Sequence, residues 1–142
     1  VQSKDITERI AVASGKIYIS SASLIKIKEG GHKKGDVLGV ARIAGITAAK
    51  KTADLIPLCH NINLSSVNID FKINKSKKYV ECIANVKSTG KTGVEMEALT
   101  AVQISLLTIY DMCKSIDKGM VISEIKLELK KGGASGEWKR SK

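Results

Sequence analysis

The chain has 142 residues, of which 43% are hydrophobic and 27% charged. A chain of this length buries roughly 68–70% of its unfolded surface, so we expect a single folded domain over residues 1–142. The composition excludes a disordered or low-complexity protein. Lys and Arg number 24 against 14 Asp and Glu, and the resulting net charge of +10 favours an anionic partner: nucleic acid, an acidic protein or a phosphorylated metabolite.

Membrane and export signals are missing from the sequence. No apolar run approaches the roughly 18 to 20 residues of a membrane-spanning helix, and the polar residues 1–5 lack the apolar block of a signal peptide. We therefore expect a cytoplasmic protein with no membrane partner. The three cysteines, Cys59, Cys82 and Cys113, are odd in number and widely spaced, which is typical of free buried thiols rather than disulfides.

The first half of the chain predicts a strand followed by helices. In residues 9–20, β-branched side chains surround Gly15, which marks a bulge or bend in a strand. A short helical segment is expected over residues 23–28, ending at a pair of glycines. Residues 35–52 are rich in small apolar side chains and predict a helix that another backbone approaches closely. Pro57 closes this region.

The second half predicts a hairpin, a long helix and a last strand. Strict alternation at residues 66–73 and 80–87, with the polar residues 74–78 between them, predicts the hairpin. The longest helical pattern covers residues 92–116, and residues 124–130 alternate again. The order βαββαβ indicates an α+β fold of the ferredoxin-like class, with an antiparallel four-stranded sheet and two long helices on one face.

The apolar stripe of the long helix is expected to face the sheet. Its members recur at helical spacing: Leu99, Val102, Leu106, Ile109, Cys113 and Ile116.

Cys59 and His60 stand side by side in the segment 55–60, which is not a regular helix. Three interpretations compete: a metal site, a nucleophilic Cys with a His base, and a structural His. A metal site needs further ligands, and Cys82 and Cys113 occupy core positions. Adjacent residues on an extended chain point to opposite sides, which disfavours the Cys–His pair. The lysines that end the preceding helix favour a functional role for His60.

Charged residues stand at both ends of the long helix. Thr92 and Glu95 have the spacing of a capping box, and Glu97 is not needed for such a cap. Asp111 and Lys114 lie at i and i+3, the spacing of a surface ion pair. At about 1.5 Å per residue, Glu97 and Asp111 are about 21 Å apart along the axis. A pocket that contains both therefore requires a second copy of the chain.

Two glycine-rich segments carry adjacent lysines. Residues 33–36 open the first long helix, and residues 130–136 follow the last strand. Their backbone N–H groups and lysines suit phosphate oxygens, although neither segment is a Walker sequence. The basic stretch 130–142 is expected to be mobile until it binds a ligand.

Five motifs stand in order along the chain: Lys33–Leu38, Ala41–Gly45, Leu55–His60, Thr92–Leu99 and Tyr110–Lys114. Together they closely resemble the molybdenum cofactor biosynthesis protein C family, the cyclic pyranopterin monophosphate synthases. The resemblance runs from about Thr7 to Gly136. Two departures are visible, because Asn61 and Ala134 stand where the family usually has Pro and Lys.

The resemblance implies a ferredoxin-like subunit in a homo-oligomer, a hexamer built from dimers with active sites between paired subunits. It implies a nucleotide-derived substrate, (8S)-3′,8-cyclo-7,8-dihydroguanosine 5′-triphosphate, converted to cyclic pyranopterin monophosphate with release of pyrophosphate. The enzyme would be a lyase. No cofactor and no protein-bound metal are implied, and a requirement for Mg²⁺ with the triphosphate is left open.

The resemblance also implies the site residues. Asp111 and Lys114 are the catalytic candidates, as a proton-transfer pair. The substrate-binding candidates are Lys34, His60, Glu95, Glu97 and Lys130. Carboxylates, His and Lys suit the proton transfers that rebuild a purine-derived ring as a pterin, and lysines offset the charge of the phosphates and the leaving group.

The alternative is a non-enzymatic RNA-binding module, because small basic βαββαβ domains often bind single strands on the sheet. Such modules carry an aromatic pair on the central strands. The alternating positions of the third strand here hold Val80, Cys82, Ala84 and Val86, which disfavours RNA. An oligomer without activity is a third alternative, supported by Ala134 alone.

Overall fold

The computed structural model describes residues 7–30, 35–134 and 136–141. The helices and strands in these ranges are, in chain order, β1 (Thr7–Tyr18), α1 (Ser21–Glu29), α2 (Val37–Lys50), α3 (Thr52–Leu55), β2 (Ser66–Asn74), β3 (Tyr79–Gly90), α4 (Glu95–Cys113), β4 (Val121–Lys131) and β5 (Trp138–Lys139).

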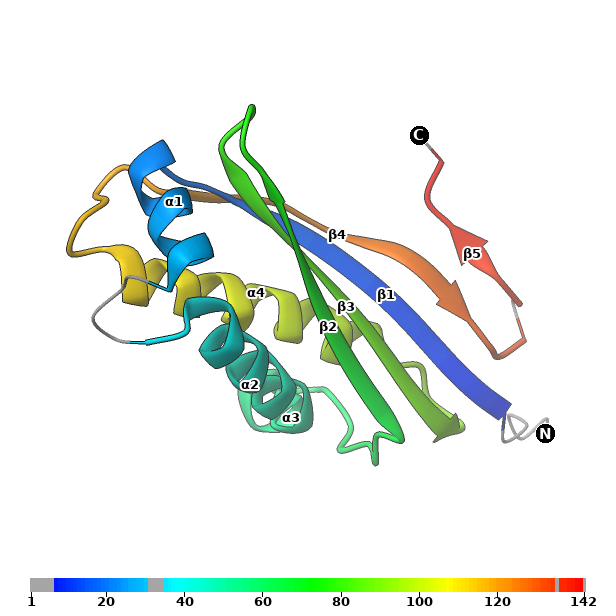
Figure 1. The fold of residues 1–142 in the computed structure, drawn as a ribbon. Coiled ribbons are helices and arrows are strands. Elements are labelled where there is room, and N and C mark those ends of the chain that lie inside the picture. The colour runs from blue at the N-terminus through cyan, green and yellow to red at the C-terminus, as the bar shows by residue number, and fades with distance from the viewer. Residues whose placement is uncertain (1–6, 31–34, 135, 142) are drawn as a thin grey trace.

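The described strands form one antiparallel sheet in the order β2-β3-β1-β4-β5 (Figure 1). The α+β class and the predicted hairpin are confirmed. The four-stranded sheet is not, because β5 adds a fifth strand in which Trp138 pairs with Lys130. Part of the 130–142 stretch, which we expect to be mobile until it binds a ligand, extends this sheet: the Arg140 N–H and Nε donate to the carbonyls of Glu128 and Leu127 at 2.9 and 2.8 Å.

Helices α2 and α4 pack side by side and cover one face of the sheet (Figure 1). Helix α4 lies against β1, β3 and β4, and α2 lies against β2. The centre of the predicted α4 stripe is confirmed, because Val102, Leu106, Ile109 and Cys113 are fully buried. Its ends are not. Leu99 is half-buried, and Ile116 follows the end of the helix and is 45% exposed.

The predicted helix over residues 35–52 is divided. Asp36 caps α2, since its Oδ1 accepts from the Gly39 N–H at 3.0 Å. The helix ends at Lys50, and the short α3 begins after Lys51. The Thr52 hydroxyl donates to the carbonyls of Ala48 and Ala49, at 3.1 and 2.9 Å. The Ala48 carbonyl also accepts from the Lys51 N–H at 3.0 Å, so the Thr52 hydroxyl adds side-chain hydrogen bonds to the last turn of α2.

Helices α2 and α4 approach each other closely at Gly45. A side chain at this position would collide with the Ser105 hydroxyl and the end of Ile69. The Ser105 hydroxyl donates to the Ala41 carbonyl at 3.0 Å, a buried hydrogen bond between the two helices. The close approach expected from the small residues of this helix is thus confirmed.

Gly45→Ala should lower the free energy of unfolding by about 1–2 kcal/mol, because overpacking at the helix crossing outweighs the gain of about 1 kcal/mol in helix propensity. Urea unfolding measures the change. Thr47→Ala, on the exposed side of the same helix, is the matched control and should leave stability unchanged or slightly higher. Equal stability of the two variants would contradict the crossing described here.

None of the three cysteines is in a disulfide, as predicted, and the predicted burial is confirmed for Cys82 and Cys113 but not for Cys59. Burial raises the pKa of Cys82 to about 12 and that of Cys113 to about 11. Both therefore remain protonated core side chains near neutral pH. Cys59 is half-buried and lies elsewhere, beside the start of α4.

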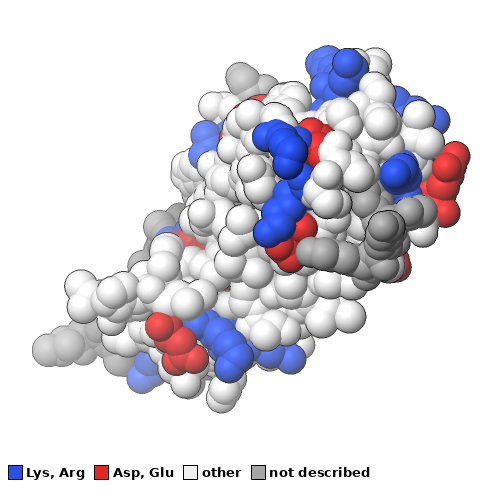
Figure 2. Space-filling model, turned by 90° about the vertical axis from the view of Figure 1, so that its left-hand side faces the viewer, with Lys and Arg blue, Asp and Glu red and all other residues white. Residues whose placement is uncertain are grey.

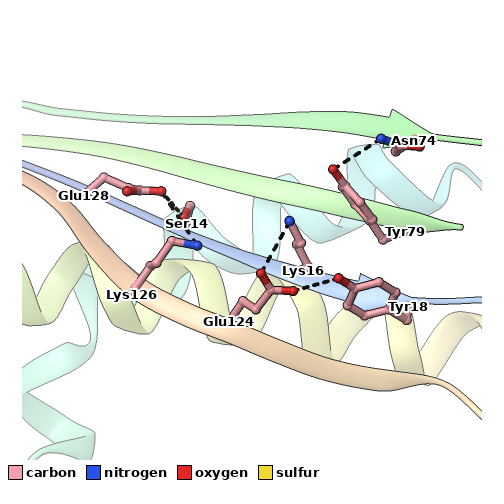
Figure 3. Close-up of polar contacts among 8 residues, drawn as sticks. All are labelled: Ser14, Lys16, Tyr18, Asn74, Tyr79, Glu124, Lys126 and Glu128. Atoms are coloured by element: carbon pink, nitrogen blue, oxygen red, sulfur yellow. Dashed lines mark hydrogen bonds and ion pairs between the residues drawn. The ribbon is translucent and has the colours of Figure 1, made fainter. Parts of the chain in front are cut away.

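The face of the sheet opposite the helices carries a polar cluster (Figure 3). The Tyr18 hydroxyl donates to Glu124 Oε2 at 2.7 Å, and Lys16 Nζ lies 3.4 Å from Oε1 of the same carboxylate. Lys16 also stands over the Tyr79 ring, 4.4 Å from its centroid. The pairing of β1 with β4 shifts at Gly15, where Glu124 has a φ of 60°. The predicted bulge is therefore confirmed, and it turns Glu124 toward Tyr18.

A second irregularity of β4 lies further along the strand, at Glu128. The register passes from Val12↔Leu129 to Ala13↔Leu127, which leaves Glu128 as an extra residue. Glu128 accepts a hydrogen bond of 2.6 Å from the Ser14 hydroxyl (Figure 3). The bulge reverses the alternation of β4 beyond this point.

Tyr18 and Tyr79 form an aromatic pair on the neighbouring strands β1 and β3, with ring centroids 5.5 Å apart. The expectation that the central strands lack such a pair is wrong. The row from Val80 to Val86 is fully buried and faces the helices, whereas the open-face row of β3 begins one residue earlier, at Tyr79.

Candidate active site at the start of helix α4

Glu95, in the first turn of α4, forms an ion pair with Lys130 of β4, with Nζ 2.9 Å from Oε2. Lys130 pairs with Ala11, which is fully buried in the row that faces the helices. The bulge at Glu128 is what places it there, since strict alternation would put Leu129 on that side. Burial alone would raise the pKa of Glu95, but the hydrogen bond from Lys130 and the Lys130 charge bring it below its ordinary value.

The capping-box interpretation is wrong. Helix α4 begins at Glu95, its N-cap is Val94, and no side chain caps this end. Glu95 turns toward Lys130 instead of back toward Thr92. The ion pair with Lys130 gives Glu95 a charge-assisted hydrogen bond in place of the one that a capping box would supply.

Glu97 points inward from the same turn and is 2% exposed. Its Oε2 lies 3.8 Å from the Cys59 sulfur, and its Oε1 is buried with no hydrogen-bond partner in the described part of the chain. Burial raises the pKa of Glu97, and the nearby negative charge of Glu95 raises it further. Two carboxyl groups two residues apart thus have pKa values shifted in opposite directions.

Cys59 and His60 follow α3 in a loop that passes the start of α4. The thiol lies 3.7 Å from the His60 carbonyl, while the His60 side chain is exposed. The burial of the thiol raises the pKa of Cys59, and Glu97 adds to the rise. The thiol is therefore protonated, which weighs against its role as a nucleophile or metal ligand.

Sequence reasoning missed Arg9. It is 5% exposed, and its guanidinium donates to the carbonyls of Gly90 and Lys91, at 3.0 and 2.9 Å. A side chain at Gly133 would collide with this guanidinium, so the glycine-rich segment packs directly on it. The sequence does contain a signal for its burial, because Arg9 continues the alternating row of Ala11 and Ala13 along β1. We call Arg9, Cys59, Glu95, Glu97 and Lys130 the α4 N-terminal cluster.

Asp111 and Lys114 form the predicted ion pair, at 3.1 Å. Their side chains are 58% and 59% exposed, at the opposite end of α4. Since the helix rises about 1.5 Å per residue, Asp111 is about 21 Å along the axis from Glu97. One chain does not bring this pair to the α4 N-terminal cluster.

Lys34, a substrate-binding candidate, lies outside the described residues. Within residues 7–30, 35–134 and 136–141, no group of three or more His, Cys, Asp and Glu residues is arranged to hold a metal ion. In the same ranges, no helix has both the length and the apolar character needed to cross a bilayer.

The sequence profile of the MoaC family matches residues 1–133. The chain belongs to the MoaC family. MoaC proteins are enzymes of molybdenum cofactor biosynthesis, so the chain has a role in that pathway. The match includes the whole α4 N-terminal cluster and the Asp111–Lys114 pair, and it ends before β5.

A structure of a variant of the ferredoxin protease FusC in complex with Arabidopsis ferredoxin matches with a TM-score of 0.36 and 8% sequence identity. The match covers 81% of this chain and 11% of that chain. The similarity is too low to carry any conclusion about fold or function.

Glu97→Gln should stabilise the fold, increasingly so as the pH rises. Because folding raises the pKa of Glu97 above its ordinary 4.5, wild-type stability falls as the pH rises through the interval between 4.5 and the folded value, whereas Gln carries no charge to bury. Urea unfolding at a series of pH values measures the difference. The exposed Glu29→Gln is the control. A Glu97→Gln difference that stays constant with pH would show that burial of the charge is not the cause.

Proposed function

We propose that the chain is a lyase that converts (8S)-3′,8-cyclo-7,8-dihydroguanosine 5′-triphosphate to cyclic pyranopterin monophosphate and pyrophosphate. The observation that carries the proposal is the α4 N-terminal cluster, where an ionised carboxylate paired with an ammonium adjoins a buried carboxyl of raised pKa. Ring rearrangement needs groups that give and take protons. Closing the cyclic phosphate needs cations near the phosphates.

The closure of the cyclic phosphate can be written with side chains that this protein supplies. A sugar hydroxyl oxygen attacks the α-phosphorus, its proton passes to a base, and the bond from the α-phosphorus to the bridging oxygen of the β-phosphate breaks. Pyrophosphate leaves, and ammonium groups offset its charge. We assign Lys34, His60 and Lys130 to the phosphates or the ring, and Glu95 and Glu97 to substrate binding. Asp111 and Lys114 are the proton-transfer pair.

The site is shared between two copies of the chain in this proposal. The support is geometric, because α4 separates Glu97 from Asp111 by about 21 Å and one helix cannot fold back on itself. A two-fold pairing in which the two α4 helices lie antiparallel would place the start of one α4 beside the end of its partner's. We further propose a hexamer built from such dimers in the cytoplasm and a ferredoxin-like core of β2-β3-β1-β4, to which β5 is an addition. No cofactor is assigned, and Mg²⁺ would enter with the triphosphate.

The RNA-binding alternative is disfavoured because other side chains already contact Tyr18 and Tyr79, the aromatic pair on which bases would stack. Lys16 covers the face of the Tyr79 ring, and the Tyr18 hydroxyl is bonded to Glu124. A base could stack only after these contacts broke, and the carboxylates of Glu124 and Glu128 would repel phosphates. On the side of the molecule in Figure 2, Lys and Arg groups are separated by uncharged and acidic ones rather than joined in a basic stripe.

Lys114→Ala and Asp111→Ala should each slow a single turnover of the cyclised triphosphate by about 100-fold or more, the usual effect of removing a proton-transfer group. Release of pyrophosphate and formation of the pterin product are the measurements. Lys118→Ala, an exposed lysine just beyond α4, is the matched control and should react at the wild-type rate. A near-normal rate in either variant refutes the catalytic assignment of that residue.

Mixing two inactive variants should restore activity if the site is shared. Lys130→Ala removes a group at one end of α4 and Lys114→Ala a group at the other, so each mixed dimer has one intact site. Random assembly on co-expression makes about half the dimers mixed, which restores about a quarter of the wild-type sites. The co-purified mixture is assayed for pyrophosphate release. Sites built from a single chain would give no recovery above that of the separate variants.

A further inference from the structure

The Cys59 thiol lies between two acceptors at the start of α4. Its sulfur is 3.8 Å from Glu97 Oε2 and 3.7 Å from the His60 carbonyl oxygen. The loop around it is held by a hydrogen bond of 3.1 Å from the Cys59 N–H to the Ile56 carbonyl. A thiol has one proton, so it can donate to only one of these acceptors at a time.

The charge state of Glu97 determines to which of the two acceptors the S–H group donates. When Glu97 is ionised, the S–H donates to Oε2. When Glu97 is neutral and carries its proton on Oε2, that O–H donates to the sulfur and the S–H turns to the His60 carbonyl. No bond between heavy atoms changes, and each state has every proton accounted for.

In both states the other carboxyl oxygen is left without a partner. Oε1 is buried in a side chain that is 2% exposed, and a buried polar atom without a hydrogen bond is unfavourable. The contact of Oε2 with the sulfur fixes the rotation of the carboxyl group. Oε1 therefore keeps one orientation and can accept from an N–H or O–H group of a bound molecule.

We propose that Cys59 is a positioning residue for Glu97, which fixes the carboxyl through Oε2 so that Oε1 receives a donor group of the substrate. The proposal rests on the proposed function for the identity of that substrate, but the thiol–carboxyl contact itself does not. It gives Cys59 a role distinct from metal binding or nucleophilic attack, and it uses the protonated form in which burial holds this thiol.

The charged groups of the described residues that affect Glu97, directly or through Glu95, come from three elements, α4, β4 and β1. Glu95 of the same helix raises the pKa of Glu97, and Lys130 of β4 and Arg9 of β1 act on Glu95. Cys59 acts in the opposite sense to Glu95, because its S–H stabilises the ionised carboxylate. Removing the thiol should therefore raise the pKa of Glu97 further.

The test uses the unliganded full chain, so that it does not depend on activity. Titration of the Glu97 carboxyl carbon by NMR should show a higher pKa in Cys59→Ala than in the wild type, and no change in Cys82→Ala, a buried cysteine in the sheet. In infrared spectra, the S–H stretch of Cys59 should move to lower frequency as Glu97 ionises. In Glu97→Gln the same band should not move with pH.

Each result supports or overturns the positioning role. An unchanged Glu97 titration in Cys59→Ala, or a Cys59 S–H band that ignores pH in the wild type, overturns it. If Cys59→Ala does not fold, the infrared comparison of the wild type with Glu97→Gln still decides. A wild-type chain that shows the coupling but does not convert the cyclised triphosphate would refute the proposed function and leave the pair standing. In an active enzyme, Cys59→Ala should also shift the pH profile of kcat/KM toward higher pH.

Discussion

The packing of helix α4 on the sheet determines where each charged group of the candidate site lies. Val102, Leu106 and Ile109 are fully buried, so the helix cannot rotate about its axis without exposing them. With this rotation fixed, Glu97 is buried near one end of the helix, whereas Asp111 is exposed near the other end. A helix is also a rigid spacer, which fixes the separation of these two residues at about 21 Å. Any pocket that uses both depends on the association of chains, not on rearrangement within one.

Strand β4 is the second element on which the site depends, because its bulges decide which face each lysine and glutamate occupies. Beyond the bulge at Glu128, the alternation reverses, and Lys130 joins the buried row opposite Ala11 while Leu129 pairs with Val12 on the open face. This explains why the Glu95–Lys130 pair could not be predicted from the sequence. The alternating pattern of 124–130 assigned Leu129 to the core, and a one-residue shift of register sends every later side chain to the other face.

The parts of the fold that sequence analysis predicted well are those where one local rule acts alone. Alternation located the hairpin, and glycine in a left-handed conformation at Gly30 ended α1. The spacing of Asp111 and Lys114 predicted their ion pair. Prediction failed where a distant partner competes with the local rule. Glu95 forms an ion pair with Lys130 instead of a capping bond, and Trp138 pairs with the edge of β4. Arg9 lies in the core row because two backbone carbonyls and a glycine pair accommodate it.

The first turn of α4 holds two carboxyl groups whose difference has a local cause. The helix N-terminus favours the charged form of both, so it cannot separate them. Lys130 keeps Glu95 ionised, whereas burial favours the neutral form of Glu97. When the pKa values of two neighbouring carboxyl groups are shifted in opposite directions, one group can act as a fixed charge and the other as a proton donor or acceptor. A polyanionic substrate would strengthen this division, because its negative charge would raise the pKa of Glu97 again while Lys130 remains available to both Glu95 and a phosphate. In the proposed function, substrate binding would therefore change the protonation of Glu97 through a single helical turn.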